Sequence, residues 1–273
     1  MTCVTVENRI YFIEGLPGSG KTTLSKKIYL ELCSDNKNVK LYRECEKNPL
    51  DLTRYAWIEN SKLQEMLSAQ KINFELNAKI NSLADVQENM VLLPYMSLYS
   101  DISTEKIARQ LAKFDVYNGH LDLKKFSELH VKRWENYADY MKKSDEISVC
   151  DGILLQSPMF ELIGYFDLDI NEISRYISKL IDTIRDLNPI LFYIEVNNVE
   201  KNLNNICQER KTVNGKREWE QGVVRWIDNA PYCKKRNMRG HSGMNDFFKD
   251  RERIERIVIE KLSIQTIRLK RNV

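Results

Sequence analysis

Short apolar runs alternate along this chain with longer stretches in which apolar residues recur every three or four positions. The short runs are rich in β-branched and aromatic residues and have the length of strands; they cover 9–14, 39–43, 146–150, 189–196 and 264–269. After the first run, Leu24, Ile28 and Leu32 recur at helical spacing. Because helical patterns separate the runs, we predict an α/β fold with a five-stranded, mainly parallel sheet.

The long stretch between the second and third predicted strands has mostly helical patterning. Apolar positions repeat at intervals of three and four in 61–83, 104–114 and 124–141, and a short extended segment at 90–95 interrupts them. We therefore expect a helical insertion at about residues 50–140. No linker rich in Ser, Gly or Pro separates it from the rest, so residues 1–273 are expected to form a single domain.

The most specific motif follows the first predicted strand directly. Residues 15–22 read GLPGSGKT, which fits G-x-x-x-x-G-K-[ST] between a strand and a helix. Glycines let successive backbone N–H groups point at phosphate oxygens, and a helix N-terminus favours negative charge. We expect a phosphate-binding loop (a Walker A motif, or P-loop) that binds nucleotide through Gly15, Gly18, Ser19, Gly20, Lys21, Thr22 and Thr23.

Two residues of this loop carry most of its chemistry. In such loops the lysine reaches the β- and γ-phosphates of a nucleoside triphosphate, and the hydroxyl after it ligates Mg²⁺. Lys21 and Thr22 stand at these positions. ATP and Mg²⁺ are therefore the expected cofactors.

The loop and the order of strands and helices together resemble the P-loop nucleoside and nucleotide kinases, especially the deoxynucleoside kinase and thymidylate kinase group. The resemblance is specific at the loop and covers most of the chain as a pattern. It implies a three-layer sandwich, a helical acceptor-binding insertion after the second strand, and an arginine-bearing lid after the fourth, here at about 211–240. The chain also resembles uncharacterised bacterial P-loop proteins with a similar Trp-rich segment.

The resemblance implies a general base just after the second strand, where a carboxylate takes the proton of the acceptor hydroxyl. Glu44 stands at this place, and Glu46 is the alternative. Kinases of the group often continue with proline, whereas this chain continues with Cys45. A surface carboxylate at a strand end is the other interpretation of Glu44.

A second carboxylate follows the third predicted strand. The resemblance implies that Asp151 holds Mg²⁺, partly through water, or orients the acceptor. Gly152 stands where the deoxynucleoside kinases often carry an arginine. Aspartate also caps turns, so a structural role stays open. Which of Glu44, Glu46 and Asp151 is the base stays open as well.

Basic residues follow the fourth predicted strand. Arg210, Lys211 and Arg217 lie where the resemblance implies a lid that closes over the phosphates, with Arg210 and Arg217 as the catalytic arginines. A planar guanidinium suits the oxygens of a phosphoryl group in transfer. A solvated basic helix end is the alternative. Trp219 and Trp226 are expected to fix the far end of the lid to the core.

The insertion carries residues able to contact a planar acceptor. Its large aromatic residues are Trp57, Tyr95, Tyr117, Trp134 and Tyr137. Core packing is the preferred interpretation for each of them, since aromatic side chains dominate cores. Arg54, Arg133 and Tyr95 are the candidate acceptor contacts.

Composition and charge exclude several classes of protein. The chain has 273 residues, with 42% hydrophobic and 30% charged residues, as globular proteins have. A net charge of +3 is too small to indicate nucleic acid. No apolar run reaches the ~18 residues of a membrane span, and the first residues lack a signal-peptide core. We expect a cytoplasmic protein with neither nucleic acid nor membrane as a partner.

Cysteines and histidines suggest neither disulfides nor a protein-bound metal centre. The six cysteines are scattered and contain no CxxC pair, which favours reduced thiols. The three histidines show no metal-ligand spacing. The Mg²⁺ expected here is the one that accompanies the nucleotide. Ser242 is expected to cap the last long helix.

We predict an enzyme, an ATP- and Mg²⁺-dependent kinase that transfers the γ-phosphoryl group to a hydroxyl or phosphate of a nucleoside, nucleotide or other small acceptor. An antibiotic or sugar-derivative phosphotransferase on the same fold is an alternative. A P-loop NTPase and a non-catalytic nucleotide-binding regulator are others; Gly152 after Asp151 lacks the acidic pair of one ATPase class. The acceptor, the choice of ATP or GTP and the oligomeric state, a homodimer included, stay open.

Overall fold

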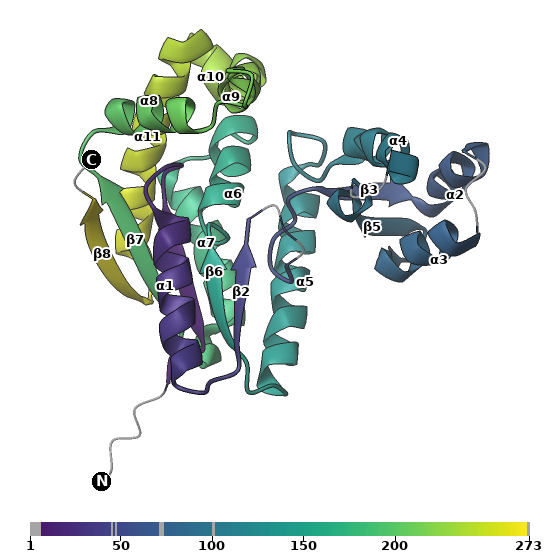
Figure 1. Cartoon of the computed structure of the whole chain (residues 1–273), viewed down its shortest axis with the longest axis horizontal. Helices are drawn as coiled ribbons and strands as arrows, with labels where there is room; N and C mark the ends of the chain where they lie inside the picture. The colour runs from purple at the N-terminus through teal and green to yellow at the C-terminus, as the bar shows by residue number, and fades with distance from the viewer. Residues whose placement is uncertain (1–6, 45, 47, 71–73, 100–101, 272–273) are drawn as a thin grey trace.

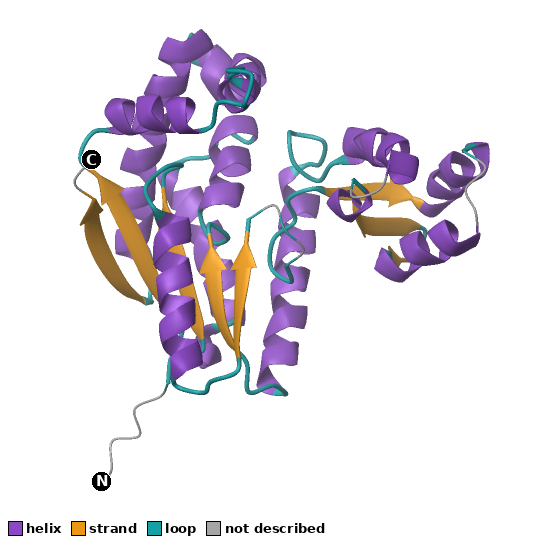
Figure 2. Ribbon diagram, in the orientation of Figure 1, coloured by secondary structure: helices purple, strands orange, loops and turns teal. Residues whose placement is uncertain are grey.

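The structure, a computed structural model, describes residues 7–44, 46, 48–70, 74–99 and 102–271 (Figures 1 and 2). Five strands form one all-parallel sheet in the order β2-β6-β1-β7-β8. Their bounds are β1 Ile10–Gly15, β2 Val39–Arg43, β6 Ile147–Asp151, β7 Ile190–Val196 and β8 Gln265–Arg271. The five predicted strands and their parallel arrangement are confirmed, with small shifts at the strand ends.

Helices cover both faces of this sheet, one on one face and three on the other (Figure 1). Side chains such as Ile13 and Val149 pack under α1, while Phe12 and Cys150 belong to the larger core on the opposite face. Because successive side chains of a strand point to opposite faces, these strands are apolar on both sides. The covering helices are α1 (Lys21–Ser34), α5 (Leu123–Lys142), α7 (Ile170–Thr183) and α11 (Gly240–Lys261).

Further helices complete the main body of the protein, after β6 and on either side of β7 in the chain. Those after β6 are α6 (Gln156–Met159) and the π-helical turn η3 (Phe160–Tyr165), and η4 (Arg185–Leu187) precedes β7. Those after β7 are α8 (Val199–Glu209), α9 (Glu218–Asn229) and α10 (Pro231–Lys235). The segment expected to form the lid therefore consists largely of α9 and α10.

The insertion is not purely helical, so this part of the prediction is wrong. It contains a three-stranded antiparallel sheet in the order β3-β5-β4, and β5 confirms the extended segment expected at 90–95. The strands are β3 (Tyr55–Glu59), β4 (Asp85–Gln87) and β5 (Met90–Pro94). Strands this short are stabilised by pairing with distant residues, which a local pattern does not report.

The helices of the insertion surround this small sheet. The region 61–83, which has helical patterning, forms two helices, and residues 71–73 between them lie outside the described part. The elements are α2 (Asn60–Ala69), α3 (Phe74–Leu83), η1 (Tyr95–Leu98), α4 (Ile102–Leu111) and η2 (Ala112–Phe114). Buried residues such as Ile58, Leu93 and Leu111 form a hydrophobic cluster separate from the main core. Figure 1 shows this unit beside the main sheet, joined to it along α5.

The structure also bears on three further expectations, which concern the cap of the last helix, the cysteines and membrane-spanning helices. Helix α11 begins at Gly240, so Ser242 lies inside its first turn and is not the N-cap. Cys33, Cys150, Cys207 and Cys233 carry free thiols, and Cys3 and Cys45 lie outside the described residues. Within the described residues, none of the helices combines the length and the apolar character that a membrane-spanning helix requires.

Candidate functional site

The carboxyl ends of three strands lie level at one edge of the main sheet. Asp151 pairs in register with Ile13 of β1 and with Arg43 of β2. Strand β1 lies in the middle, where the chain turns from one half of the sheet to the other. Ligands of open parallel sheets bind in the crevice at such a switch point. The strand order thus places the segments after β1, β2 and β6 around one site.

The P-loop connects β1 to α1, and its glycines have conformations that other residues rarely adopt. Gly15, Gly18 and Gly20 have φ values of 142°, 79° and 101°. A Cβ atom at Gly15 would lie 2.6 Å from the carbonyl oxygen of Ile194. Gly15 therefore lets the loop curl closely against β7.

Lys21 folds back over this loop. Its Nζ donates hydrogen bonds to the carbonyl oxygens of Gly15, at 2.9 Å, and Leu16, at 3.1 Å. The Ser19 hydroxyl is buried in the loop and lacks a hydrogen-bond partner among the described residues. An unpaired buried hydroxyl beside a buried ammonium group fits a ligand with several oxygen acceptors, as a phosphate has. Thr22 and Thr23 are exposed at the first turn of α1.

Carboxylates surround Lys21. Burial lowers the pKa of its ammonium group, and the negative charges of three carboxylates oppose that shift; these belong to Glu44, Glu14 and Asp151. Glu44 and Asp151 are the two carboxylates expected at the site. The fold therefore brings residues from the ends of β1, β2 and β6 around one lysine.

Glu44 and Lys21 both lie close to Gly152. A Cβ atom at Gly152 would lie 3.2 Å from Oε2 of Glu44 and 3.4 Å from Cε of Lys21. Burial raises the pKa of the Glu44 carboxyl, and the Lys21 charge opposes this. Gln156 donates a hydrogen bond to Glu44. Glu46, by contrast, is exposed and pairs with Arg43 at 3.6 Å, so Glu44 is the carboxylate that faces the P-loop lysine.

Asp151 contacts the first helix. It is 3% exposed, and its Oδ2 accepts a hydrogen bond from the Ser25 hydroxyl at 3.2 Å. No group of three or more His, Cys, Asp or Glu residues suited to a metal ion occurs among the described residues. Magnesium in phosphoryl transfer needs few protein ligands, because phosphates and water supply the others. The Asp151 carboxylate and the Thr22 hydroxyl are oxygen donors of the kind that Mg²⁺ takes.

Glu14 is a third carboxylate of this site, which the sequence analysis did not select. It is fully buried at the end of β1, and burial raises its pKa to about 8. Its carboxyl oxygens accept hydrogen bonds from the backbone N–H groups of Leu154, at 2.6 Å, and Gln156, at 3.1 Å. Glu14 thus fixes the segment after β6 that carries Gly152 and Gln156. The signal for Glu14 in the sequence is its position as an acidic residue inside an apolar strand.

A cavity of about 410 Å³ opens beside Glu44. Its polar lining includes Glu44, Gln156 and Arg210, together with Thr53, Arg54, Asp115, Tyr117 and Asn118 of the insertion. Its apolar lining includes Phe160, Trp219, Val223 and Trp226. We call this the acceptor cavity; its volume and mixed lining are typical of small-molecule sites.

The arginines expected in the lid differ in position. Arg210 lines the acceptor cavity, and its positive charge lowers the pKa of Glu44. Its guanidinium lies over the ring of Trp219, with Cζ 4.9 Å from the centroid. Arg217 is exposed, and its Nη1 lies 3.4 Å from Oε2 of Glu220. Lys211 is also exposed. The structure brings Arg210 to the site and leaves Arg217 outside the cavity lining.

The tryptophans after the lid arginines pack as expected. The ring of Trp226 lies against Phe160 and Phe247, with both centroid distances 4.9 Å. A Cβ atom at Gly164 would lie 2.3 Å from that ring. Trp226 thus attaches α9 to the core, while Trp219 supports Arg210.

The three candidate acceptor contacts lie in different places. Arg54 lines the acceptor cavity, as does Tyr117, for which core packing was the preferred interpretation. Tyr95 is buried and donates a hydrogen bond to Asp115 of that cavity, so it supports the lining from behind. Arg133 lies elsewhere, in a second cavity.

The other insertion aromatics pack in or beside the core. Trp134 is fully buried and stacks on Phe12, with ring centroids 5.8 Å apart. Tyr137 is buried too, and Trp57 is partly buried against the main core. Core packing, the preferred interpretation, is confirmed for Trp134.

The last strand brings to the P-loop a cation that the sequence pattern does not indicate. Parallel pairing with β7 places Arg271 level with Val196. The Arg271 guanidinium donates a hydrogen bond to the carbonyl oxygen of Gly18. Only the register of β8, which is a long-range contact, brings this residue to the loop.

Comparison with known proteins identifies no relative: no protein-family model matches the chain, and no curated protein matches its sequence. A function for this chain is therefore argued from its own residues.

Proposed function

We propose that the protein is an ATP- and Mg²⁺-dependent kinase that phosphorylates a small molecule held in the acceptor cavity. One observation carries the proposal: a Cβ atom at Gly152 would lie within 3.4 Å of both the P-loop lysine and Glu44, and Glu44 also lines the cavity. A phosphoryl donor on the loop and a hydroxyl in the cavity would then meet between Lys21 and Glu44.

The P-loop would hold the donor. Its backbone N–H groups, the Ser19 hydroxyl and the Lys21 ammonium group are suited to phosphate oxygens. Asp151 and Thr22 would hold Mg²⁺ beside them. ATP supplies the γ-phosphoryl group when bound, and the protein contributes position and positive charge.

Glu44 would serve as the general base. A base must lie within hydrogen-bond reach of the acceptor hydroxyl and be deprotonated when it acts. Burial raises the pKa of Glu44, and the nearby Lys21 and Arg210 oppose that shift and favour the charged carboxylate. Gln156 holds the carboxylate in place. The exposed Glu46 does not meet the first requirement.

Arg210 would stabilise charge on the transferred group. It lies at the end of α8 and lines the acceptor cavity together with Glu44. Its guanidinium rests on Trp219 and forms no ion pair among the described residues, so it can turn toward a phosphate. Arg217 has no comparable position.

The proposal is tested by incubating the protein with Mg²⁺, γ-labelled ATP and a panel of nucleosides, nucleotides, sugars and hydroxylated antibiotics, and then locating the label by mass spectrometry. We expect label on a small acceptor with wild-type protein and with Lys26→Ala, which changes an exposed lysine of the same helix. Lys21→Ala is expected to reduce transfer by about 10²–10³-fold. Rapid release of inorganic phosphate without a labelled acceptor would favour an NTPase, and binding of ATP without turnover would favour a regulator.

A further inference from the structure

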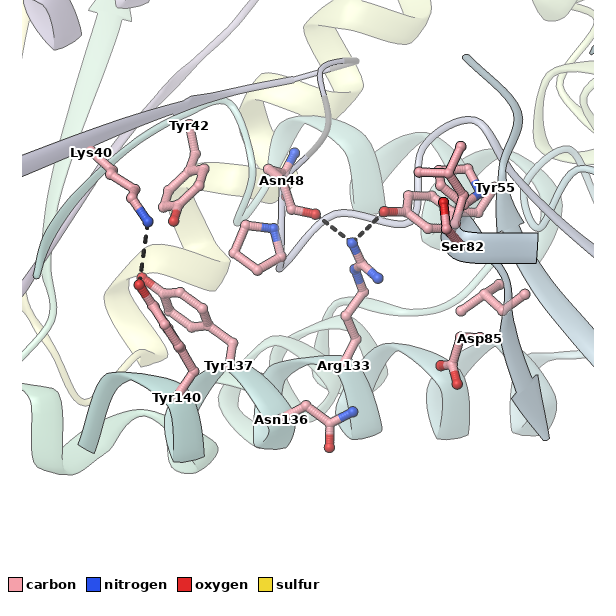
Figure 3. A pocket seen from close by; sticks show the side chains of 14 residues that line it. Lys40, Tyr42, Asn48, Tyr55, Ser82, Asp85, Arg133, Asn136, Tyr137 and Tyr140 are labelled. Carbon is pink, nitrogen blue, oxygen red and sulfur yellow. Dashed lines mark hydrogen bonds between the residues drawn. The ribbon is translucent and has the colours of Figure 1, made fainter. Parts of the chain in front are cut away.

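A second cavity, of about 550 Å³, lies between the main sheet and the insertion (Figure 3). Strand β2 contributes Lys40 and Tyr42, helix α5 contributes Arg133, Tyr137 and Tyr140, and Tyr55 comes from β3. It shares none of its lining residues with the acceptor cavity. The proposed kinase reaction gives it no role.

The positive charge of Arg133 acts on the buried carboxyl of Asp51, where it opposes the rise in pKa that burial causes, but the two groups form no salt bridge. Its Nη2 donates hydrogen bonds to two neutral oxygens, the carbonyl of Asn48 and the Tyr55 hydroxyl, the latter at 2.6 Å (Figure 3). Its Nε is buried, with no hydrogen-bond partner among the described residues, and no ion pair of Arg133 occurs among them. A buried donor of this kind favours an anionic oxygen as ligand.

The other cation of the cavity is already paired. Lys40 lies 2.7 Å from the buried carboxylate of Glu146. The same carboxylate accepts hydrogen bonds from the hydroxyls of Tyr42 and Tyr140, both at 2.9 Å. Glu146 therefore satisfies these polar groups and fixes the two rings. Arg133 is therefore the cation of the lining without a salt-bridge partner among the described residues, and Asp85 is the acidic residue of the same lining.

The tyrosines form an aromatic wall. The ring of Tyr137 lies 6.4 Å from that of Tyr42, edge to face, and 6.4 Å from that of Tyr140. Leu92 and Pro94 of β5 are apolar residues in the same lining. Rings arranged in this way favour a planar apolar group, which can stack on a face or an edge. Tyr137 and Tyr140 of this wall lie one and two turns after Arg133 on helix α5.

We propose that this cavity is a binding site for a small aromatic acid, with the ring against the tyrosines and the anionic group on Arg133. Carboxylates and phosphates both provide the oxygens that a guanidinium recognises. The volume suits a ligand of one to three fused rings. Binding at this site requires neither ATP nor the proposed kinase activity.

The site is connected to the acceptor cavity through a segment of which residues 44, 46 and 48–55 are described. Asn48 holds this segment together: its Nδ2 donates to the carbonyl of Arg43 at 3.2 Å, and its Oδ1 accepts from the N–H groups of Leu50 and Asp51, at 3.0 and 2.6 Å. Arg133 in turn holds the carbonyl of Asn48. Glu44, Thr53 and Arg54 of the same segment line the acceptor cavity. A ligand on Arg133 therefore changes the support of the wall that carries Glu44.

The test uses 2-naphthoate and 2-naphthyl phosphate as probes, titrated into the full chain without nucleotide and followed by calorimetry and by fluorescence. The uncharged 2-naphthalenemethanol is the control ligand. Arg133→Gln removes the charge, and Ser82→Trp fills the edge of the cavity while leaving Arg133 in place. Lys132→Gln removes an exposed charge one residue away on the same helix and is the control variant. Hydrogen exchange of residues 44–55 is compared with and without probe.

We expect saturable binding of at least one of the two anionic probes to wild-type protein and to Lys132→Gln, with affinity reduced at least tenfold in Arg133→Gln and in Ser82→Trp. We also expect altered exchange in 44–55. Binding of both acids, or of one alone, shows which oxyanion the site takes. Equal binding of the uncharged probe, unchanged affinity in folded Ser82→Trp, or no saturable binding would overturn the proposal and would leave the kinase proposal untouched.

Discussion

Gly152→Ala tests how closely Glu44 and Lys21 must approach. Gly152 has a φ of 73°, a left-handed conformation in which alanine is strained. The added Cβ would also lie 3.2 Å from Oε2 of Glu44 and 3.4 Å from Cε of Lys21, closer than most such contacts. The substitution therefore places a methyl group close to both the proposed base and the phosphate-binding lysine.

The substitution is expected to have a small effect on stability and a large effect on turnover. The backbone strain is expected to lower the free energy of unfolding by about 1–2 kcal/mol. Displacing either functional group by a fraction of an ångström is expected to lower turnover by about 10²-fold, because reacting groups must be held closely in line. Activity should therefore fall far more than the loss of folded protein can explain.

Two other glycines provide matched controls for the strain. Gly215 has the same φ of 73°, Gly240 has a φ of 60°, and a Cβ at either would meet nothing within 4 Å. Urea unfolding measures stability, and transfer of label from Mg·ATP to the acceptor measures turnover. We expect all three alanine variants to lose similar stability and only Gly152→Ala to lose turnover. Turnover of Gly152→Ala within threefold of both controls would refute the reasoning.

Three further variants address the groups around the site. Burial raises the pKa of Glu14 from 4.5 to about 8, so the stability that its protonated form contributes is complete below pH 4.5 and is lost as pH rises through 8. Glu14→Gln should flatten this fall in stability, which urea unfolding at pH 5 and pH 8.5 measures. Gly164→Ala forces a methyl group into the ring of Trp226 and should lower the free energy of unfolding by about 1–3 kcal/mol. Glu255→Gln leaves the buried charge of Arg251 without its partner at 2.6 Å and should cost about 3–5 kcal/mol in the same assay.

Two of these variants, Gly164→Ala and Glu255→Gln, have a counterpart that lacks the stated cause. Gly222→Ala also changes a helical glycine, but its Cβ would meet nothing within 4 Å, so it should be neutral or stabilising. Glu105→Gln breaks an exposed pair with Arg109 at the same helical spacing and should cost less than about 1 kcal/mol. Equal losses in the paired variants would contradict the roles assigned to Trp226 and to the buried ion pair.

The central strands β1, β6 and β7 could be predicted because they are almost wholly buried on both faces and are therefore nearly continuous apolar runs, whereas the edge strands β2 and β8 are only partly buried and alternate apolar with polar residues. The P-loop could be predicted because its glycines and its lysine have fixed spacing. Glu44 and Asp151 followed from the rule that the residues after parallel strands meet at one edge. Their convergence on Lys21 agrees with that rule.

Long-range contacts account for what the sequence did not reveal. The short strands β3 and β4 exist through pairing with β5, and no local period marks them. Glu14 is a polar residue in an apolar strand, and its role depends on backbone groups far along the chain. Arg271 reaches the P-loop through the register of β8. Arg133 points to a second cavity because of the way the insertion packs on α5.

The most direct test of the central claim is single-turnover transfer of label from Mg·ATP to the acceptor, compared between wild type and Glu44→Gln over a range of pH. The claim predicts a rate lowered by about 10²–10⁴-fold in Glu44→Gln, with the affinity for Mg·ATP retained. In the wild type the rate should rise with pH as the Glu44 carboxyl, whose pKa burial raises, loses its proton, and the variant should lack this rise. Transfer by Glu44→Gln at the wild-type rate, with the same dependence on pH, would contradict it.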